Sequence, residues 1–263
     1  MVELNKIYCE NCLDTMARMP DNFIDLTVTS PPYDDLRNYN GYDFDFESTA
    51  GELFRVTKIG GGVVWVVGDK IMNGSETGTS FKQALYFKEI GFNLHDTMIY
   101  LKDGFAFPEA KRYQPVFEYM FVFSKNKLKT FNPIKRKTIY GAITEIERER
   151  QKDGTIRATK MRYQLENGNL GNVWLYGTGY MKTGKDKIAY RHPAQFPEQL
   201  AADHIYSWSN KHDLVYDPLT GSGTTIKMAH LLNRKWIGSE ISKDYCEIAE
   251  KRISAYTMQQ ELF

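Results

Sequence analysis

The sequence DPLTGSGTT at residues 217–225 decides the fold, because it follows the apolar residues LVY and opens an amphipathic run. Glycines between a strand and a helix let the backbone approach a ligand closely, and the helix that follows begins with unpaired N–H groups. A P-loop would have lysine at the position of Thr224, and the dinucleotide fingerprint would have a small residue at the position of Ile226. The stretch therefore predicts a strand–turn–helix unit whose ligand site does not cradle phosphate.

Glu240 supplies a second feature of that ligand site. It lies 19 positions after Gly221, at the end of the run KWIGSE. A carboxylate at the end of a neighbouring strand can accept hydrogen bonds from ribose hydroxyls. A glycine-rich turn with this acid, and without phosphate-binding features, indicates a nucleoside-like cofactor such as S-adenosylmethionine. A turn with a purely structural role is the alternative.

Outward from this unit, apolar runs rich in β-branched residues alternate with amphipathic stretches, which predicts an α/β fold. Several of the expected strands end at a turn rich in glycine or proline, where open α/β sheets place their ligand sites. Strands are expected at 23–29, 62–67, 98–102, 116–124, 213–216 and 235–240, and helices at 46–58, 80–90, 197–205, 223–232 and 243–258.

The charge of the 263-residue chain is unevenly distributed, although 34 basic and 33 acidic residues nearly cancel. Residues 125–192 hold 16 Lys and Arg against 6 Asp and Glu, and the remainder holds 18 against 27. A basic block in an acidic body is typical of nucleic-acid binders. Because its apolar periodicity is weak, we expect 125–190 to form a small insert on the ligand edge of the sheet, with a solvated loop as the alternative.

Composition excludes several other classes of protein. The three cysteines have no framework spacing, so we expect reduced thiols, and the single C-x-x-C lacks the second pair that would complete a zinc site. The N-terminus lacks the features of a signal peptide. The longest apolar run, GGVVWVVG from Gly61, is far shorter than the roughly 20 residues that span a bilayer. We therefore expect a cytoplasmic protein with no metal and no membrane partner.

The sequence TSPPY at residues 29–33 is the catalytic candidate. Two consecutive prolines fix φ and remove two backbone donors, so the preceding strand cannot continue as a central ladder. Ser30 offers a hydroxyl, Pro31 a carbonyl acceptor and Tyr33 a stacking face, which together suit a planar base held by its amino group. Accepting both amino hydrogens would localise the nitrogen lone pair for attack on a methyl sulfonium. A proline pair that merely ends a strand is the alternative.

Taken together, TSPPY and DPLTGSGTT resemble the amino-directed DNA methyltransferases, which methylate adenine N6 or cytosine N4. HPAQFPEQLAADHI at 192–205 resembles the family's cofactor-side motif, and the stretch from YCENC to SPPY at 8–33 resembles its N-terminal lead-in. The motif order matches the permuted beta group. The resemblance covers nearly the whole chain except the interior of 125–190. It implies a three-layer, Rossmann-like methyltransferase sheet, mostly parallel with an antiparallel strand, plus a small basic recognition insert.

The resemblance also implies a division of labour along the chain. Residues 1–124 would form the catalytic half, 125–190 the target-recognition insert, 191–258 the cofactor-binding half and 259–263 a tail. Leu219 stands where the family often has phenylalanine, and Glu10-Asn11 stands where the lead-in usually has Gly-Asp. The flipped base would be held by Ser30, Pro31, Pro32 and Tyr33, and S-adenosylmethionine would be bound by Asn11, Phe196, Asp217, Leu219, Gly221, Ser222, Gly223, Thr224 and Glu240.

The substrate implied by the resemblance is double-stranded DNA, from which the target base must be extruded. Basic side chains would mainly neutralise phosphates. The aromatic run 174–180 could contact bases, and the stretch 34–45 would form a loop over the site. The DNA-binding candidates are Arg37, Lys135, Arg136, Lys137, Arg157, Lys160 and Arg162.

Serine at position 30 favours cytosine N4 over adenine N6, because DPPY is the common adenine form in this family. Carbon-5 methylation is excluded, since neither Cys9 nor Cys12 follows a proline. Adenine-N6 methylation is the first alternative. Methylation of RNA or a small molecule, and a DNA-binding relative without turnover, are the others.

The tail QQELF at 259–263 resembles the pentapeptide that binds the bacterial sliding clamp. Apolar anchors on a free terminus can fill a partner's groove, although Leu262 and Phe263 could instead fold back on their own domain. Members of the family often dimerise, but nothing in the sequence identifies an interface.

Overall fold

The computed structural model describes residues 2–32, 44–104, 111–137, 143–164 and 167–260, with residues 143–147, 149, 158–164 and 258–260 described by their backbone alone. The chain forms two compact units. Unit 1 comprises Met1–Asn132 and Asn172–Phe263, and unit 2 comprises Pro133–Gly171.

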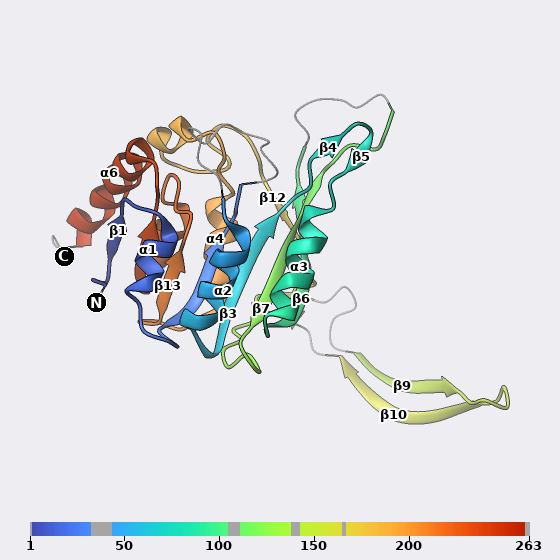
Figure 1. Ribbon diagram of the computed structural model, residues 1–263. Coiled ribbons are helices and arrows are strands. Elements are labelled where there is room, and N and C mark those ends of the chain that lie inside the picture. Colours follow the sequence, from blue (N-terminus) through green and yellow to red (C-terminus); the bar gives the residue numbers. More distant parts are fainter. Residues whose placement is uncertain (1, 33–43, 105–110, 138–142, 165–166, 261–263) are drawn as a thin grey trace. The chain divides into compact units, whose positions relative to one another are not determined.

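Unit 1 is built on an eight-stranded sheet with the order β1-β14-β13-β2-β3-β7-β6-β12 (Figure 1). Strand β7 runs antiparallel to both of its neighbours, and every other pair in this sheet is parallel. The strands are β1 (Lys6–Tyr8), β2 (Ile24–Thr29), β3 (Thr57–Val67), β6 (Asn93–Lys102), β7 (Phe117–Ser124), β12 (Val173–Tyr176), β13 (Leu214–Asp217) and β14 (Lys235–Ser239). The predicted fold, a mostly parallel sheet with an antiparallel strand, is confirmed.

Helices cover both faces of this sheet. Figure 1 shows α1, α2 and α3 on the near face and α4 behind it, where α4, α5 and α6 pack one against the next. The helices are α1 (Cys12–Ala17), α2 (Phe46–Val56), α3 (Thr79–Glu89), α4 (Glu198–Trp208), α5 (Thr224–Leu231) and α6 (Lys243–Gln260), with a 3-10 turn, η1 (Lys187–Arg191), and a short hairpin of β4 (Ile71–Met72) and β5 (Ser75–Glu76).

Aromatic side chains form the core between α3 and the sheet. Phe87 is fully buried and stacks on Phe123 with ring centroids 4.5 Å apart. It meets Trp65 edge-on at 5.1 Å, and Trp65 donates its indole N–H to Gln83 Oε1 over 2.8 Å. Offset and edge-on pairs of this kind stabilise a core beyond the area they bury.

The expected elements occur, with boundaries that shift by a few residues. The largest differences lie at 57–61, which start β3 although the preceding helix was expected to run to residue 58, and at 93–97, which extend β6. The short elements β1, α1 and β12 were not expected. Three to six residues are too few for periodicity to distinguish them from loop.

The second unit is shorter than the basic insert expected at 125–190. Asn132 N donates to Ser207 O over 2.8 Å, and Val173–Tyr176 pair in parallel with β6, so the flanks of the insert belong to unit 1. Some basic side chains of these flanks make contacts within unit 1. Lys125 donates to the carbonyl of Phe54, and Lys182 forms an ion pair with Asp103. Unit 2 retains 9 basic and 5 acidic residues.

Unit 2 consists of two antiparallel strand pairs. Strand β8 (Lys135–Lys137) pairs with β11 (Asn167–Asn169), and β9 (Ile143–Arg150) pairs with β10 (Ile156–Gln164), with a bulge between Ala158 and Lys160. None of the helices among the described residues is long and apolar enough to cross a bilayer.

Replacement of Phe87 by alanine should lower the free energy of unfolding by about 3–5 kcal/mol, because it opens a cavity in the aromatic core. Leu85→Ala is the matched control on the same helix. Leu85 is 64% exposed, so its truncation should change stability by less than about 0.5 kcal/mol. Urea denaturation followed by circular dichroism measures both, and equal losses would contradict the assignment of the core.

Candidate active site

The two motifs singled out in the sequence meet at the carboxyl edge of the sheet. Strands β2 and β13 are parallel neighbours, so the residues that follow them emerge side by side. Thr29 Oγ1 donates to Asp217 Oδ1 over 2.7 Å, and Thr225 Oγ1 donates to Val28 O over 3.0 Å. Residues separated by 188 and 197 positions in the sequence are thereby held in one place.

Asp217 acts as a brace between these strands. Its side chain is buried, and Oδ1 also accepts from the backbone N–H of Leu219 over 3.1 Å. Burial raises the pKa of Asp217 to about 6, although the hydrogen bonds from Thr29 and Leu219 oppose the shift. The carboxylate therefore holds the glycine-rich turn to β2.

The turn itself requires glycine at two positions. Gly221 has φ of +52°, and a Cβ there would lie 2.9 Å from Nε2 of His192. Gly223, with φ of +84°, is the N-cap of α5, and its Cβ would lie 3.1 Å from that of Ala249. Positive φ is strained for other residues, and both positions are also closely packed.

Glu240 is fixed to this turn from the end of β14. Its Oε2 accepts from Gly221 N over 2.8 Å, and its Oε1 accepts from Ser242 N over 2.9 Å. The residue is 9% exposed, and burial raises the pKa of its carboxyl group despite these hydrogen bonds. The structure thus orients the carboxylate through two backbone donors, which do not depend on the side chains at positions 221 and 242.

A buried ion-pair network supports the turn from α6. Arg252 is almost fully buried, and its Nη1 donates to Ser222 O over 3.0 Å and to Thr224 Oγ1 over 3.1 Å. The same guanidinium pairs with Asp186 at 2.6 Å and with Glu198.

Lys227 completes this network, with Nζ 2.7 Å from carboxylate oxygens of both Asp186 and Glu198. Burial favours the neutral form of Asp186, but hydrogen bonds from Lys227, Tyr256 and Arg252 outweigh it and hold the pKa at about 2. The network therefore links the turn after β13 to Asp186 and Glu198. These two residues flank the segment that forms the adjoining wall of the cavity described next.

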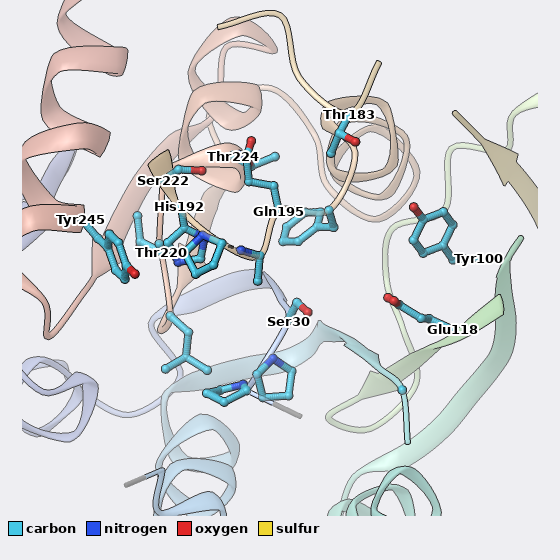
Figure 2. Close-up of a pocket in the computed structure, with 18 of the residues that line it drawn as sticks. Ser30, Tyr100, Glu118, Thr183, His192, Gln195, Thr220, Ser222, Thr224 and Tyr245 are labelled. Atoms are coloured by element: carbon cyan, nitrogen blue, oxygen red, sulfur yellow. Dashed lines mark hydrogen bonds between the residues drawn. The ribbon is translucent and has the colours of Figure 1, made fainter. Parts of the chain in front are cut away.

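A cavity of about 1140 Å³ opens onto these elements. Figure 2 shows Ser30, His192, Thr220, Ser222 and Thr224 around it, with Tyr100 and Glu118 on another side. The ring centroids of His192 and Tyr245 lie 4.4 Å apart. Polar groups from one end of the sheet and apolar groups such as Leu219 and Phe196 share the lining, as is typical of small-molecule sites.

Most of the predicted catalytic and cofactor-binding residues line this cavity. Asp217 and Gly223 do not, because they lie behind the turn as brace and helix cap, and Tyr33 and Arg37 lie outside the described residues. Those that line it are Asn11, Ser30, Pro31, Pro32, Phe196, Leu219, Gly221, Ser222, Thr224 and Glu240.

The cavity also contains residues that were not singled out as a site. His192 and Gln195 belong to the quoted stretch HPAQFPE, so the signal for them was present in the sequence. Thr183 and Tyr245 come from segments without a recognisable motif, and only the fold brings them to the cavity. Asp45 ends the stretch 34–45 that was expected to lie over the site.

Comparison with known proteins identifies the family. A model of the N6/N4 DNA methylases, described as DNA methylase, matches residues 24–251. The chain belongs to this family of DNA methyltransferases. It is 60% identical over 240 residues to the orphan methyltransferase M.BamHII of Bacillus amyloliquefaciens, covering 90% of this chain and 91% of that one. It is 27% identical over 260 residues to the type II methyltransferase M.BglII of Bacillus subtilis, covering 95% and 69%.

Solved structures of DNA methyltransferases share the fold. The cytosine-N4-specific PvuII DNA methyltransferase superposes with a TM-score of 0.68 at 18% identity, over 95% of this chain and 86% of that one. The M1.HpyAVI complex with S-adenosylmethionine superposes with a TM-score of 0.61 at 20% identity, over 94% and 98%. This DNA methyltransferase accordingly uses S-adenosylmethionine as its methyl donor, as its family does.

The cavity is chemically suited to that donor. Glu240 lies at the end of the strand next to β13 and keeps lone pairs beyond the two used by Gly221 and Ser242, enough to accept from vicinal hydroxyls. Leu219 and Phe196 offer apolar surface for a purine ring, and hydroxyls of Ser222 and Thr224 are at hand for polar groups.

Gly221→Ala should weaken S-adenosylmethionine binding by about tenfold, because the added methyl group is strained at positive φ and displaces His192. Gly74→Ala is the matched control, since Gly74 has φ of +81° and no atom within 4 Å of its Cβ position. Isothermal titration calorimetry measures both affinities. An unchanged affinity in Gly221→Ala would show that the turn is not part of the cofactor site.

Proposed function

We propose that this methyltransferase moves a methyl group from S-adenosylmethionine to the N4 amino group of a cytosine extruded from duplex DNA. The observation that carries the proposal is the hydrogen-bonded junction of β2 and β13, where Ser30-Pro31-Pro32 and the glycine-rich turn line one cavity. Nucleophile and methyl donor must meet within one water-excluding site for direct transfer, and adjacent strand ends meet that requirement.

At the cofactor end, Glu240 would accept hydrogen bonds from the ribose hydroxyls, and Leu219 and Phe196 would contact the adenine. Asn11, which caps α1 by accepting from Leu13 N over 2.9 Å, would hydrogen-bond the adenine edge. When bound, S-adenosylmethionine supplies a methyl carbon made electrophilic by its sulfonium. Asp217 and Gly223 would act indirectly, by holding the turn that the cofactor contacts.

At the base end, Ser30 and the Pro31 carbonyl would accept the two amino hydrogens of the target base. Their acceptance would turn the nitrogen lone pair out of conjugation and towards the methyl group. The nitrogen loses its proton only after attack, so placement and electrostatics contribute more than a strong base. Tyr33, which the sequence places next in the motif, would stack on the base.

The choice of cytosine rests on Ser30. The family resemblance associates aspartate at this position with adenine, and this chain has serine. A neutral hydroxyl can both donate and accept, so it can bridge the amino group to its surroundings without a buried charge.

The product identifies the base. Plasmid DNA incubated with the protein and labelled S-adenosylmethionine is digested to nucleosides and analysed by mass spectrometry, and we expect N4-methyldeoxycytidine. N6-methyldeoxyadenosine would overturn the base assignment alone. DNA without label would overturn the whole proposal.

Ser30→Ala should lower kcat by about 10- to 100-fold, because one acceptor for the amino group is lost, and should leave S-adenosylmethionine affinity unchanged. Ser75→Ala, in the exposed β5 hairpin, is the control for turnover. Single-turnover methylation and calorimetry measure the two quantities. A loss of cofactor affinity that accounts for the lower rate would contradict a role at the base.

Unit 2 is proposed to contact DNA through its basic strands. Lys135, Arg136 and Lys137 form the exposed strand β8, and Arg157 is exposed on β10. The register of the β9–β10 pair places Arg157, Lys160 and Arg162 opposite Glu149, Glu147 and Glu145. An acidic residue thus stands opposite each of these three basic residues, so the formal charge of each pair sums to zero.

Arg148 and Arg150 differ from Arg157, Lys160 and Arg162 in the residues that stand opposite them in the β9–β10 register. They are exposed, and they stand opposite Ala158 and Ile156, so no acid is paired with them across the strands. Because neighbouring residues of a strand alternate between its faces, these two exposed arginines lie on the same face of β9. A two-stranded ribbon of this kind can enter the major groove.

The double variant Arg148→Ala/Arg150→Ala should reduce the slope of log affinity against log salt by about 1–2, as expected for one or two lost phosphate contacts. Arg157→Ala, opposite Glu149, should reduce it less. Fluorescence anisotropy with a duplex oligonucleotide over a salt series measures the slopes. Equal slopes in the double variant and the wild type would exclude this face.

Two further partners stay as predictions. The pentapeptide proposed to bind a sliding clamp begins in α6, and residues 261–263 lie outside the described residues. Deleting 259–263 and measuring clamp binding tests that interaction, and sedimentation tests the homodimer.

A further inference from the structure

Three side chains on the far wall of the cavity have no role in the proposed function so far. Tyr100 and Lys102 come from the end of β6, and Glu118 comes from the start of β7. Figure 2 shows Tyr100 and Glu118 facing the cavity on the side away from His192 and Tyr245. Each belongs to the same cavity lining as Ser30.

These side chains form one charged and aromatic group. Lys102 Nζ lies 2.7 Å from Glu118 Oε1, and the two side chains are 27% and 15% exposed. The same ammonium lies 5.8 Å from the centre of the Tyr100 ring, which is itself buried. A lysine held in this way presents its remaining N–H donors in a defined place at the cavity wall.

The sheet sets the distance from this group to the base-holding motif. Lys102 ends β6, which lies three strand positions from β2 in the order β2-β3-β7-β6, so its backbone is about 14 Å across the sheet from the end of β2. A base bonded at both ends needs about 6 Å of such a span for two hydrogen bonds. The remainder leaves room for a pyrimidine ring and for the side chain of the lysine.

We propose that Lys102, positioned by Glu118 and Tyr100, is the specificity-determining residue that donates a hydrogen bond to the carbonyl oxygen of the extruded cytosine. This inference rests on the proposed function, because it assumes that the amino group of the base is held at Ser30 and Pro31. It assigns to the far wall of the cavity the choice between cytosine and adenine as the base that is methylated.

The chemistry of the two bases supports that role. In cytosine the ring position two atoms from the amino-bearing carbon carries a carbonyl oxygen, which accepts hydrogen bonds. In adenine the corresponding position carries a C–H, which cannot. A site built to hydrogen-bond one substrate discriminates strongly against an analogue that leaves its polar group unpaired. A lysine at this position therefore favours cytosine by an interaction that adenine cannot make.

Glu118 is a positioning residue in this account. Its carboxylate restrains the flexible lysine stem and compensates the ammonium when the cavity is empty. The ring of Tyr100 faces the ammonium group of Lys102, so it blocks access to the lysine from that side. The preference for cytosine depends on Glu118 and Tyr100 through Lys102, and neither of the two residues has to touch the base.

The test compares two duplex oligonucleotides that differ only in whether the methylatable base is cytosine or adenine. Lys102→Met should lower kcat/KM on the cytosine duplex by about 10- to 100-fold and leave that on the adenine duplex unchanged, so the ratio of the two falls. Lys102→Arg, which keeps a donor, should retain part of the preference. Lys88→Met, on the exposed side of α3, is the control.

Glu118→Gln should shift the same ratio in the same direction by a smaller factor, with the KM for S-adenosylmethionine unchanged. Equal losses of kcat/KM on both duplexes in Lys102→Met would overturn the inference, because a phosphate contact or a structural ion pair acts on both bases alike. An unchanged ratio would overturn it as well. The wild-type ratio separately tests the assignment of cytosine, so failure of that assignment is distinguishable from failure of the role of Lys102.

Discussion

The pairing of β2 with β13 is the constraint on which the rest of the site depends. Parallel strands direct the chain segments that follow them to the same edge of a sheet, and here one segment is SPP and the other is the glycine-rich turn. The hydrogen bond from Thr29 to the buried Asp217 fixes their separation. Without this junction, the two motifs would not line one cavity.

The glycine-rich turn is held from three sides, each with a different physical origin. Glu240 receives two backbone N–H groups, His192 packs where a side chain on Gly221 would lie, and Arg252 bonds the carbonyl of Ser222. Burying the charges of Arg252 and Lys227 costs hydration energy, which two shared carboxylates offset. Such a network stabilises one arrangement of the glycine-rich turn, because removing any single partner leaves a buried charge.

The charge distribution shows how far composition can be interpreted. The excess of basic residues at 125–192 indicated a nucleic-acid partner, and the chain is a DNA methyltransferase. The excess is not, however, all on one surface. Lys125 and Lys182 make contacts within unit 1, and in unit 2 three glutamates stand opposite three basic residues in the β9–β10 register. Sequence composition counts charges, whereas pairing decides how many of them are available to phosphate.

By itself, the sequence determined the longer strands and helices of the sheet, the two motifs at strand ends and the family to which they belong. These are local properties, since a turn type, a helix start or a proline pair depends on a few consecutive residues. Only the tertiary structure decided that Asp217 and Gly223 lie behind the cavity wall, and that Thr183, Tyr245 and the Lys102–Glu118 pair line it. Those positions depend on the order of strands in the sheet and on side-chain packing, which bring together residues far apart in the chain. No single stretch of sequence therefore contains a pattern that predicts them.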